Sequence, residues 1–238
     1  MALAVGLYLY DSALLLYANE AVLAARRKGG WLVEFGSNKT TLRGKELYLP
    51  NPLIPTRPLF RMAWSFEHAA PDAVVGLLED GARFTRFAPA VWSLFVLTFV
   101  FLPVVLFVRL GDWAIVGVFG LIYVNLLAIV LVLWFARSQF QLSGPKAAAM
   151  GLDLLLCPPF AINIIRRLSL RLPASDLVVA ARRLQSAEGW DMTRAELTAR
   201  LTDEIAGEEE GSLRMAALVA RRDGLGDGGA WCPAPKLS

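Results

Sequence analysis

The chain has 238 residues, of which 56% are hydrophobic and 19% are charged, and its mean hydropathy is +0.49. Its 24 lysines and arginines against 21 aspartates and glutamates give a net charge of +3, which is too small to indicate a nucleic-acid-binding protein. One histidine and two widely separated cysteines, Cys157 and Cys232, cannot by themselves form a usual zinc site. We therefore expect no metal and no nucleic-acid partner.

Residues 1–88 are predicted to form a β-rich domain. Trp31–Phe35 has the period-two pattern of a half-buried strand, with Trp31, Val33 and Phe35 on one face. The dipeptide Gly29–Gly30 before it is typical of a turn. Further short strands are expected at Val5–Tyr10, at Thr40–Arg43 and at Glu46–Leu49, the last two joined through Gly44.

The segment Ala13–Lys28 is open to two interpretations. Its alanine, leucine, glutamate and arginine residues favour a helix, which Ser12 would cap and Gly29 would end. Alternatively, Ala13–Ala18 and Ala21–Ala25 form two strands of a meander. We favour the strands, because short segments separated by turns surround this part of the chain.

The hydrophobic pattern of residues 89–137 predicts a transmembrane hairpin. Two uncharged apolar segments, at 91–108 and 113–136, are separated by a very short link. A bilayer core is crossed by ~20 helical residues, so both segments are long enough to span it, and the link requires them to be antiparallel. Tryptophans and arginines near the segment ends are typical of the two membrane interfaces; they are Trp92, Trp113, Trp134, Arg86, Arg109 and Arg137.

Positive charge predicts the orientation of the hairpin. The link carries one basic residue, Arg109, whereas Arg83 and Arg86 precede the hairpin and Arg137 and Lys146 follow it. Because positively charged loops stay in the cytoplasm, both termini are expected to be cytoplasmic. The chain would then be a multi-pass protein of the cell (inner) membrane.

Two residues within the spans are expected to shape the hairpin. Pro103 lacks a backbone N–H and should kink or loosen the first helix. Asn125 lies near the middle of the second span, where an amide needs a hydrogen-bond partner. We interpret it as an interhelical polar contact rather than as part of a transport path, because neither span contains an ionisable residue.

Residues 138–172 are predicted to form a broken helix that lies in the membrane interface, with Pro158 and Pro159 at the break. Asp153, in an otherwise apolar stretch, is a candidate functional carboxylate, because burial would perturb its proton affinity. Packing on the N-terminal domain, a third span and a cytosolic core helix are the alternatives for this region.

Beyond the double proline, apolar and basic residues occupy neighbouring strips of one helix. The apolar strip consists of Ile162, Ile165 and Leu168, and the basic strip of Arg166, Arg167 and Arg171. A helix lying along a membrane surface has this layout, with apolar side chains in lipid and arginines at phosphates. We therefore expect Arg166, Arg167 and Arg171 to face lipid phosphate groups.

The C-terminal part divides into a helical cytoplasmic region at 173–223 and a disordered tail at 224–238, which is rich in glycine and proline. Residues 137–183 carry seven lysines and arginines against two acidic residues, whereas residues 184–238 carry six against ten. The basic part directly follows the hairpin, where anionic lipid headgroups would attract it.

No sequence motif for catalysis or cofactor binding is found. The segment at 36–40 is led by glycine but lacks the Gly-Lys-Ser/Thr core of a phosphate loop. The lone histidine, His68, follows Glu67, and neighbours on a strand point to opposite faces. We therefore expect no catalytic residue and no cofactor.

These patterns predict an α+β membrane protein with a β-rich N-terminal cytoplasmic domain, a two-helix transmembrane hairpin and an α-helical C-terminal region. The favoured function is that of a non-catalytic accessory or scaffold protein, anchored in the lipid bilayer, which assembles with a protein partner or with copies of itself. The alternatives are a subunit of an oligomeric transporter or channel, and a membrane-interface enzyme that acts on a phosphate-bearing lipid.

Overall fold

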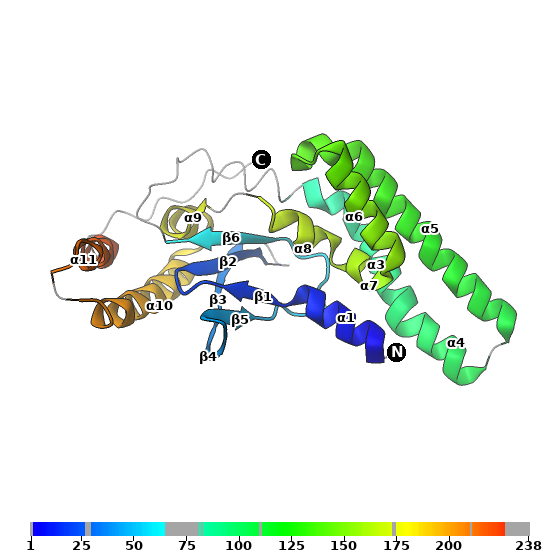
Figure 1. Ribbon diagram of the computed structural model, residues 1–238, viewed down its shortest axis with the longest axis horizontal. Helices are drawn as coiled ribbons and strands as arrows, with labels where there is room; N and C mark the ends of the chain where they lie inside the picture. Colours follow the sequence, from blue (N-terminus) through cyan, green and yellow to red (C-terminus); the bar gives the residue numbers. More distant parts are fainter. Residues whose placement is uncertain are drawn as a thin grey trace. The chain divides into compact units, whose positions relative to one another are not determined.

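The computed structural model, drawn in Figure 1, combines a small amount of β-sheet with a mostly helical remainder that includes two long apolar helices. It describes residues 2–26, 30–64, 81, 83–109, 111–172, 175–209 and 211–226. The Glu67–His68 pair and most of the expected tail at 224–238 lie outside the described residues.

The chain divides into two compact units, each assembled from segments that are far apart in the sequence. Unit 1 consists of Met1–Tyr17, Gly36–Leu59 and Leu78–Pro173, and unit 2 of Ala18–Phe35, Phe60–Leu77 and Ala174–Ser238. The strands in residues 1–62 are therefore shared between the two units, and so are the helices that follow the hairpin.

Unit 1 begins with a helix, α1 (Ala2–Ser12), where we expected a strand at Val5–Tyr10. The expectation was wrong because tertiary packing outweighs the β-propensity of valine and tyrosine. Tyr8 is buried, and its ring centroid lies 6.2 Å from that of Phe95 and 5.4 Å from that of Phe99. Helical winding places Ser12 one turn from Tyr8, and it is buried on the same face.

The sheet of unit 1 is antiparallel, with the strand order β1-β5-β4. Its strands are β1 (Leu14–Leu16), β4 (Ser37–Leu42) and β5 (Lys45–Tyr48). Between β4 and β5, Arg43 and Gly44 both have positive φ, 53° and 74°, as a two-residue type I′ turn requires. The strands predicted on either side of Gly44 are thus confirmed.

Two helices of unit 1 are long and apolar enough to cross a membrane, Phe84–Val108 and Asp112–Phe140. They include the segments 91–108 and 113–136. The first helix comprises a 3-10 turn (Phe84–Phe87), α3 (Ala88–Val96), a π-helical turn (Leu97–Phe101) and α4 (Leu102–Val108). The second comprises α5 (Asp112–Ala136) and a 3-10 turn (Arg137–Phe140).

The π-helical turn directly precedes Pro103. Proline has no N–H for the carbonyl one turn earlier, and its ring crowds that carbonyl, so regular α-winding is unfavourable at this point. A π-turn, with hydrogen bonds five residues apart, relieves the crowding by widening the helix. The predicted loosening of the first helix at Pro103 is therefore confirmed.

One face of α5 is buried. Its buried residues recur every three or four positions, as expected for a helix packed along one side: Val118, Ile122, Leu126, Ile129, Leu133 and Ala136. The helix contacts α3 and also α6 (Gly144–Leu156). A Cβ atom added to Gly151 would lie 3.1 Å from Cγ1 of Val130, so α6 approaches α5 closely at this glycine.

The helix after the hairpin is broken, as predicted. After α6, α7 (Pro158–Ile162) and α8 (Ile164–Ser169) follow as separate short helices. However, Ile162, Ile165 and Leu168 are buried inside unit 1, where α7 contacts α1, α3 and α5. The interfacial placement is thus wrong for this part, because protein rather than lipid covers the apolar strip.

Unit 2 contains a four-stranded sheet with the order β3-β2-β6-β7. The strands are β2 (Glu20–Ala25), β3 (Trp31–Phe35), β6 (Leu59–Ala63) and β7 (Ser175–Asp176). Strands β2 and β3 are antiparallel, which confirms β3 and, together with β1, the strand interpretation of Ala13–Lys28. Aromatic pairs hold the sheet together: the ring centroids of Trp31 and Phe60 are 5.7 Å apart, and those of Phe35 and Trp64 are 5.9 Å apart.

Within the described residues from 175 to 226, unit 2 has three helices, as expected for residues 173–223. They are α9 (Leu177–Leu184), α10 (Ala187–Ala206) and α11 (Leu213–Gly226). Helix α9 contacts β2 and β3, and α10 contacts both α9 and α11. Asp176 and Ser186 accept hydrogen bonds from the first backbone N–H groups of α9 and α10, and so fix where these helices begin.

Candidate functional site

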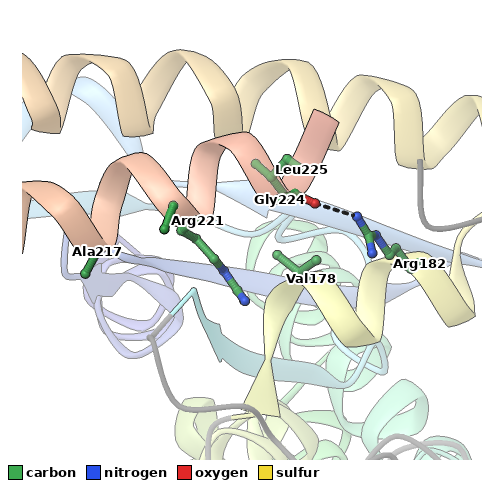
Figure 2. A pocket seen from close by; sticks show the side chains of 7 residues that line it. Val178, Arg182, Ala217, Arg221, Gly224 and Leu225 are labelled. Atoms are coloured by element: carbon green, nitrogen blue, oxygen red, sulfur yellow. Dashed lines mark hydrogen bonds between the residues drawn. The ribbon is translucent and has the colours of Figure 1, made fainter. Parts of the chain in front are cut away.

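A pocket of about 460 Å³ lies between α9 and α11 of unit 2 (Figure 2). Known small-molecule sites have volumes of roughly 300–1,000 Å³, so the pocket is large enough for a small ligand. Two arginines and five apolar or small residues line it: Val178, Arg182, Ala217, Ala220, Arg221, Gly224 and Leu225.

Asp176 organises one side of this pocket. Its buried carboxylate accepts a hydrogen bond from Nη2 of Arg221 at 2.6 Å through Oδ2. Through Oδ1 it accepts the backbone N–H groups of Val178 and Val179 at 2.8 and 3.1 Å. One carboxylate therefore begins α9 and holds the guanidinium of Arg221 beside it.

Arg182 lies on the other side of the pocket. Its Nη2 donates to the backbone carbonyl of Gly224 at 3.2 Å, the bond that Figure 2 marks with a dashed line. Its Cζ lies 5.1 Å from the centroid of the Trp190 ring, in a cation–π contact. Within the described part of the chain, the buried Nε–H groups of Arg182 and Arg221 have no hydrogen-bond partner. The pocket therefore combines two guanidinium groups with an apolar lining.

Arg166, expected at a lipid phosphate, is instead buried in unit 1 and only 2% exposed. Its Nη2 donates to the backbone carbonyls of Asn51 and Ile54 at 2.7 and 2.9 Å. Its Nη1 donates to Oγ of Ser12 at 3.2 Å and to Oδ1 of Asn163 at 3.3 Å. Burial lowers the pKa of Arg166. The expectation was wrong because four protein oxygens, rather than lipid phosphates, accept the hydrogen bonds of the two terminal nitrogens of Arg166.

Arg167 and Arg171 have different environments from that of Arg166. Nε of Arg167 is 3.1 Å from Oδ1 of Asp11, and its Cζ lies 4.8 Å from the centroid of the Phe160 ring. Burial raises the pKa of Asp11, against the opposing effect of Arg167. Arg171 is exposed beyond the end of α8. The three arginines therefore do not form the single basic strip that we expected.

The two other candidate residues also differ from expectation. Asp153 is exposed on α6 rather than buried in an apolar environment, so the reason for regarding it as a functional carboxylate is lost. Nδ2 of Asn125 donates to the carbonyl of Leu121, one turn earlier in the same helix, at 2.8 Å. This donor is thus used within α5, and an interhelical contact of Asn125 with a second copy of the chain stays a prediction.

Sequence reasoning missed the residues that line or support the pocket. Asp176 precedes an apolar helical run, which is a recognisable signal for an N-cap, but the sequence does not indicate that it also holds Arg221. Arg182 and Arg221 meet only in the folded unit. In unit 1, the polar Asn163 within the apolar stretch Ala161–Ile165 was a usable signal for a buried hydrogen-bond network.

No protein-family model, curated protein sequence or solved structure matches this chain. Its function is therefore inferred from the residues and contacts described above.

Proposed function

We propose that the protein is integral to a membrane, anchored by Phe84–Val108 and Asp112–Phe140, and that it serves there as a non-catalytic assembly component. The exposed apolar surface of the two helices carries this proposal. In the most apolar part of each helix, only 28% and 22% of the residues are buried within the protein. The core helix of a soluble protein would have most of these residues buried, and an apolar surface of this extent is unfavourable in water.

The exposure extends around the helix at the end of the hairpin that carries the link. Leu106, Phe107 and Val108 are consecutive and all exposed, as is Trp113 at the start of α5. Because an α-helix turns by about 100° per residue, three consecutive positions point to most of its circumference. Apart from Arg109 and Asp112 at the link, the described residues at this end of the hairpin present no polar face for water, which supports a lipid environment.

The opposite end of the hairpin carries the features of a cytoplasmic membrane interface. Nη1 of Arg86 donates to Oε1 of Gln139 at 3.1 Å, which joins the outer ends of the two helices. Arg137 lies over the ring of Trp134, with Cζ 4.5 Å from the centroid. By the positive-inside rule, we place this end in the cytoplasm and the link carrying Arg109 outside.

The orientation predicts the labelling of a cysteine placed at Trp113. In intact cells, the Trp113→Cys variant should react with a membrane-impermeant thiol reagent from outside, because the link is then extracellular or periplasmic. A cysteine replacing Arg86 provides the control and should react only after the cells are opened. The reverse labelling pattern would contradict the proposed orientation.

Membrane insertion is tested by an arginine at Val124, which is 64% exposed and lies at the centre of α5. An arginine at the middle of a spanning helix costs roughly 2.5–3.5 kcal/mol of insertion free energy. We therefore expect Val124→Arg to reduce membrane integration strongly, as measured by the protein that remains in membranes after carbonate extraction.

Val116 provides the matched control, since it has the same side chain, is 61% exposed and lies near the start of the same helix. Its arginine would reach the interface by extending toward the helix end, so Val116→Arg should have a much smaller effect. If both variants integrate like the wild type, α5 does not span a bilayer.

Unit 2 offers a surface for assembly. A shallow hollow of about 470 Å³ runs along α11 and is lined mostly by small and apolar residues, including Met215, Ala216 and Val219. Residues 184–238 carry more acidic than basic residues, so anionic lipid would repel this region. Both properties favour contact with a protein rather than with the bilayer.

A photoreactive amino acid at Ala216 tests this surface in intact membranes. We expect one adduct of defined mass, either with a partner protein or with a second copy of the chain. Ala195, which is exposed on the neighbouring α10, is the control position and should give little adduct. If Ala216 yields only the unlinked chain, α11 does not mediate assembly.

A further inference from the structure

We propose that the pocket between α9 and α11 binds the carboxylate of a small monoanionic ligand that carries a short aliphatic chain. This binding site is additional to membrane anchoring and assembly, and all of its residues belong to unit 2, whereas the two anchoring helices belong to unit 1.

The balance of charge at the pocket selects a monoanion. Arg182 and Arg221 line the pocket, and Asp176 neutralises Arg221 through their 2.6 Å ion pair. The nearby charges of Arg222 and Asp223 are paired with each other at 3.2 Å. One positive charge therefore remains for a ligand, and a doubly charged phosphate would leave a negative charge uncompensated in a partly buried site.

Most of the hydrogen-bonding capacity of the two arginines is not used by the part of the chain that the structure describes. A guanidinium has five N–H donors, and the bonds described for Arg182 and Arg221 engage only the Nη2 group of each. The Nε–H groups are buried and unpartnered within the described residues, as are those of Arg61 and Arg166 elsewhere, so the terminal Nη groups are the donors that a ligand would meet. Figure 2 shows both guanidinium groups at the space between α9 and α11, so a carboxylate there would reach donors of both side chains.

The rest of the lining favours an aliphatic chain. Val178, Ala217, Ala220 and Leu225 present methyl and methylene groups, and the two alanines leave space that larger side chains would fill. Burial of a CH₂ group in such surroundings contributes about 0.8 kcal/mol, so each added methylene should tighten binding until the pocket is full. The volume of about 460 Å³ suits a small molecule.

The proposal is tested with the full chain in nanodiscs of zwitterionic lipid, with hexanoate as the probe and empty nanodiscs as the reference. Isothermal titration calorimetry should show one hexanoate bound per chain. Hexan-1-ol, which has the same chain but no charge, and inorganic phosphate should each bind at least tenfold more weakly. Absence of hexanoate binding would overturn the site, and tighter binding of phosphate would overturn the assignment to a monocarboxylate.

Variants locate the binding to this pocket. Arg182→Gln removes the available charge and should weaken hexanoate binding at least tenfold, and Ala220→Leu should do the same by filling the pocket from α11. Arg183→Gln is the matched control, because it removes the same charge from α9 at a position that does not line the pocket. If Arg182→Gln and Ala220→Leu both bind hexanoate as the wild type does, the ligand binds elsewhere and the proposal is wrong.

Discussion

Replacement of Arg166 by methionine is expected to destabilise unit 1 by about 3–5 kcal/mol, since hydrogen bonds to a charged group contribute ~1.5–3 kcal/mol each. Four such bonds would be lost, to Asn51, Ile54, Ser12 and Asn163. The lower cost of burying a methionine offsets part of the loss, which is why the expected total is below the simple sum.

Thermal unfolding of the detergent-solubilised protein measures this effect. Arg171→Met is the control, because Arg171 is exposed and its replacement should change stability by only about 0.5 kcal/mol. Arg166→Lys separates charge from geometry. Lysine keeps the charge but has one nitrogen, which cannot donate both to the carbonyls of Asn51 and Ile54, as Nη2 does, and to Ser12 and Asn163, as Nη1 does. Most of the loss should therefore persist. Equal stability of the Arg166→Met and Arg171→Met variants would show that the buried network contributes little.

The second large effect is expected for Asp176→Ala in unit 2. Loss of a helix N-cap costs about 0.5–2 kcal/mol, and removal of one partner from a buried ion pair costs about 3–5 kcal/mol. Asp176 has both roles, because it caps α9 and pairs with Arg221. We therefore expect a loss of about 3–5 kcal/mol, with a corresponding fall in the unfolding midpoint, which tryptophan fluorescence of the full chain measures.

Asp176→Ser separates the two roles of this carboxylate. Serine is a good N-cap residue but is uncharged and shorter, so the variant should keep α9 capped and lose the pair with Arg221. A stability close to that of Asp176→Ala is expected if the ion pair dominates. A stability close to that of the wild type would instead show that the cap is the main contribution of Asp176.

The local sequence pattern was sufficient to predict strand β3, the turn at Gly44 and the two apolar helices. The alternation in Trp31–Phe35 and the turn at Gly44 depend on neighbouring residues, and the two apolar helices depend on length and composition. Helix α1 was not predictable in this way, because Tyr8 is fixed by aromatic contacts with Phe95 and Phe99, far along the chain.

The candidate sites could not be predicted from the local sequence pattern, and the reason is a different one. The basic and apolar strips around Arg166 look the same whether the arginine meets lipid phosphates or protein carbonyls. Its partners at Asn51 and Ile54 are backbone groups, which every residue possesses, so they leave no signal in the sequence. Arg182 and Arg221 likewise lie on separate helices, and only the packing of unit 2 brings them to one pocket.

The network around Arg166 also determines the order in which the nascent chain can mature. Ser12 and Arg166, which are hydrogen-bonded to each other, are 154 positions apart. At roughly 5–20 residues per second, a ribosome needs about 8–30 s to proceed from one to the other. Helix α1 is therefore synthesised long before its partners, and the hairpin leaves the ribosome during that interval. The packing of unit 1 around Arg166 would therefore be completed only after the hairpin is available for insertion. A delay in translation downstream of α5 would prolong the exposure of the apolar face of α1 to chaperones and proteases.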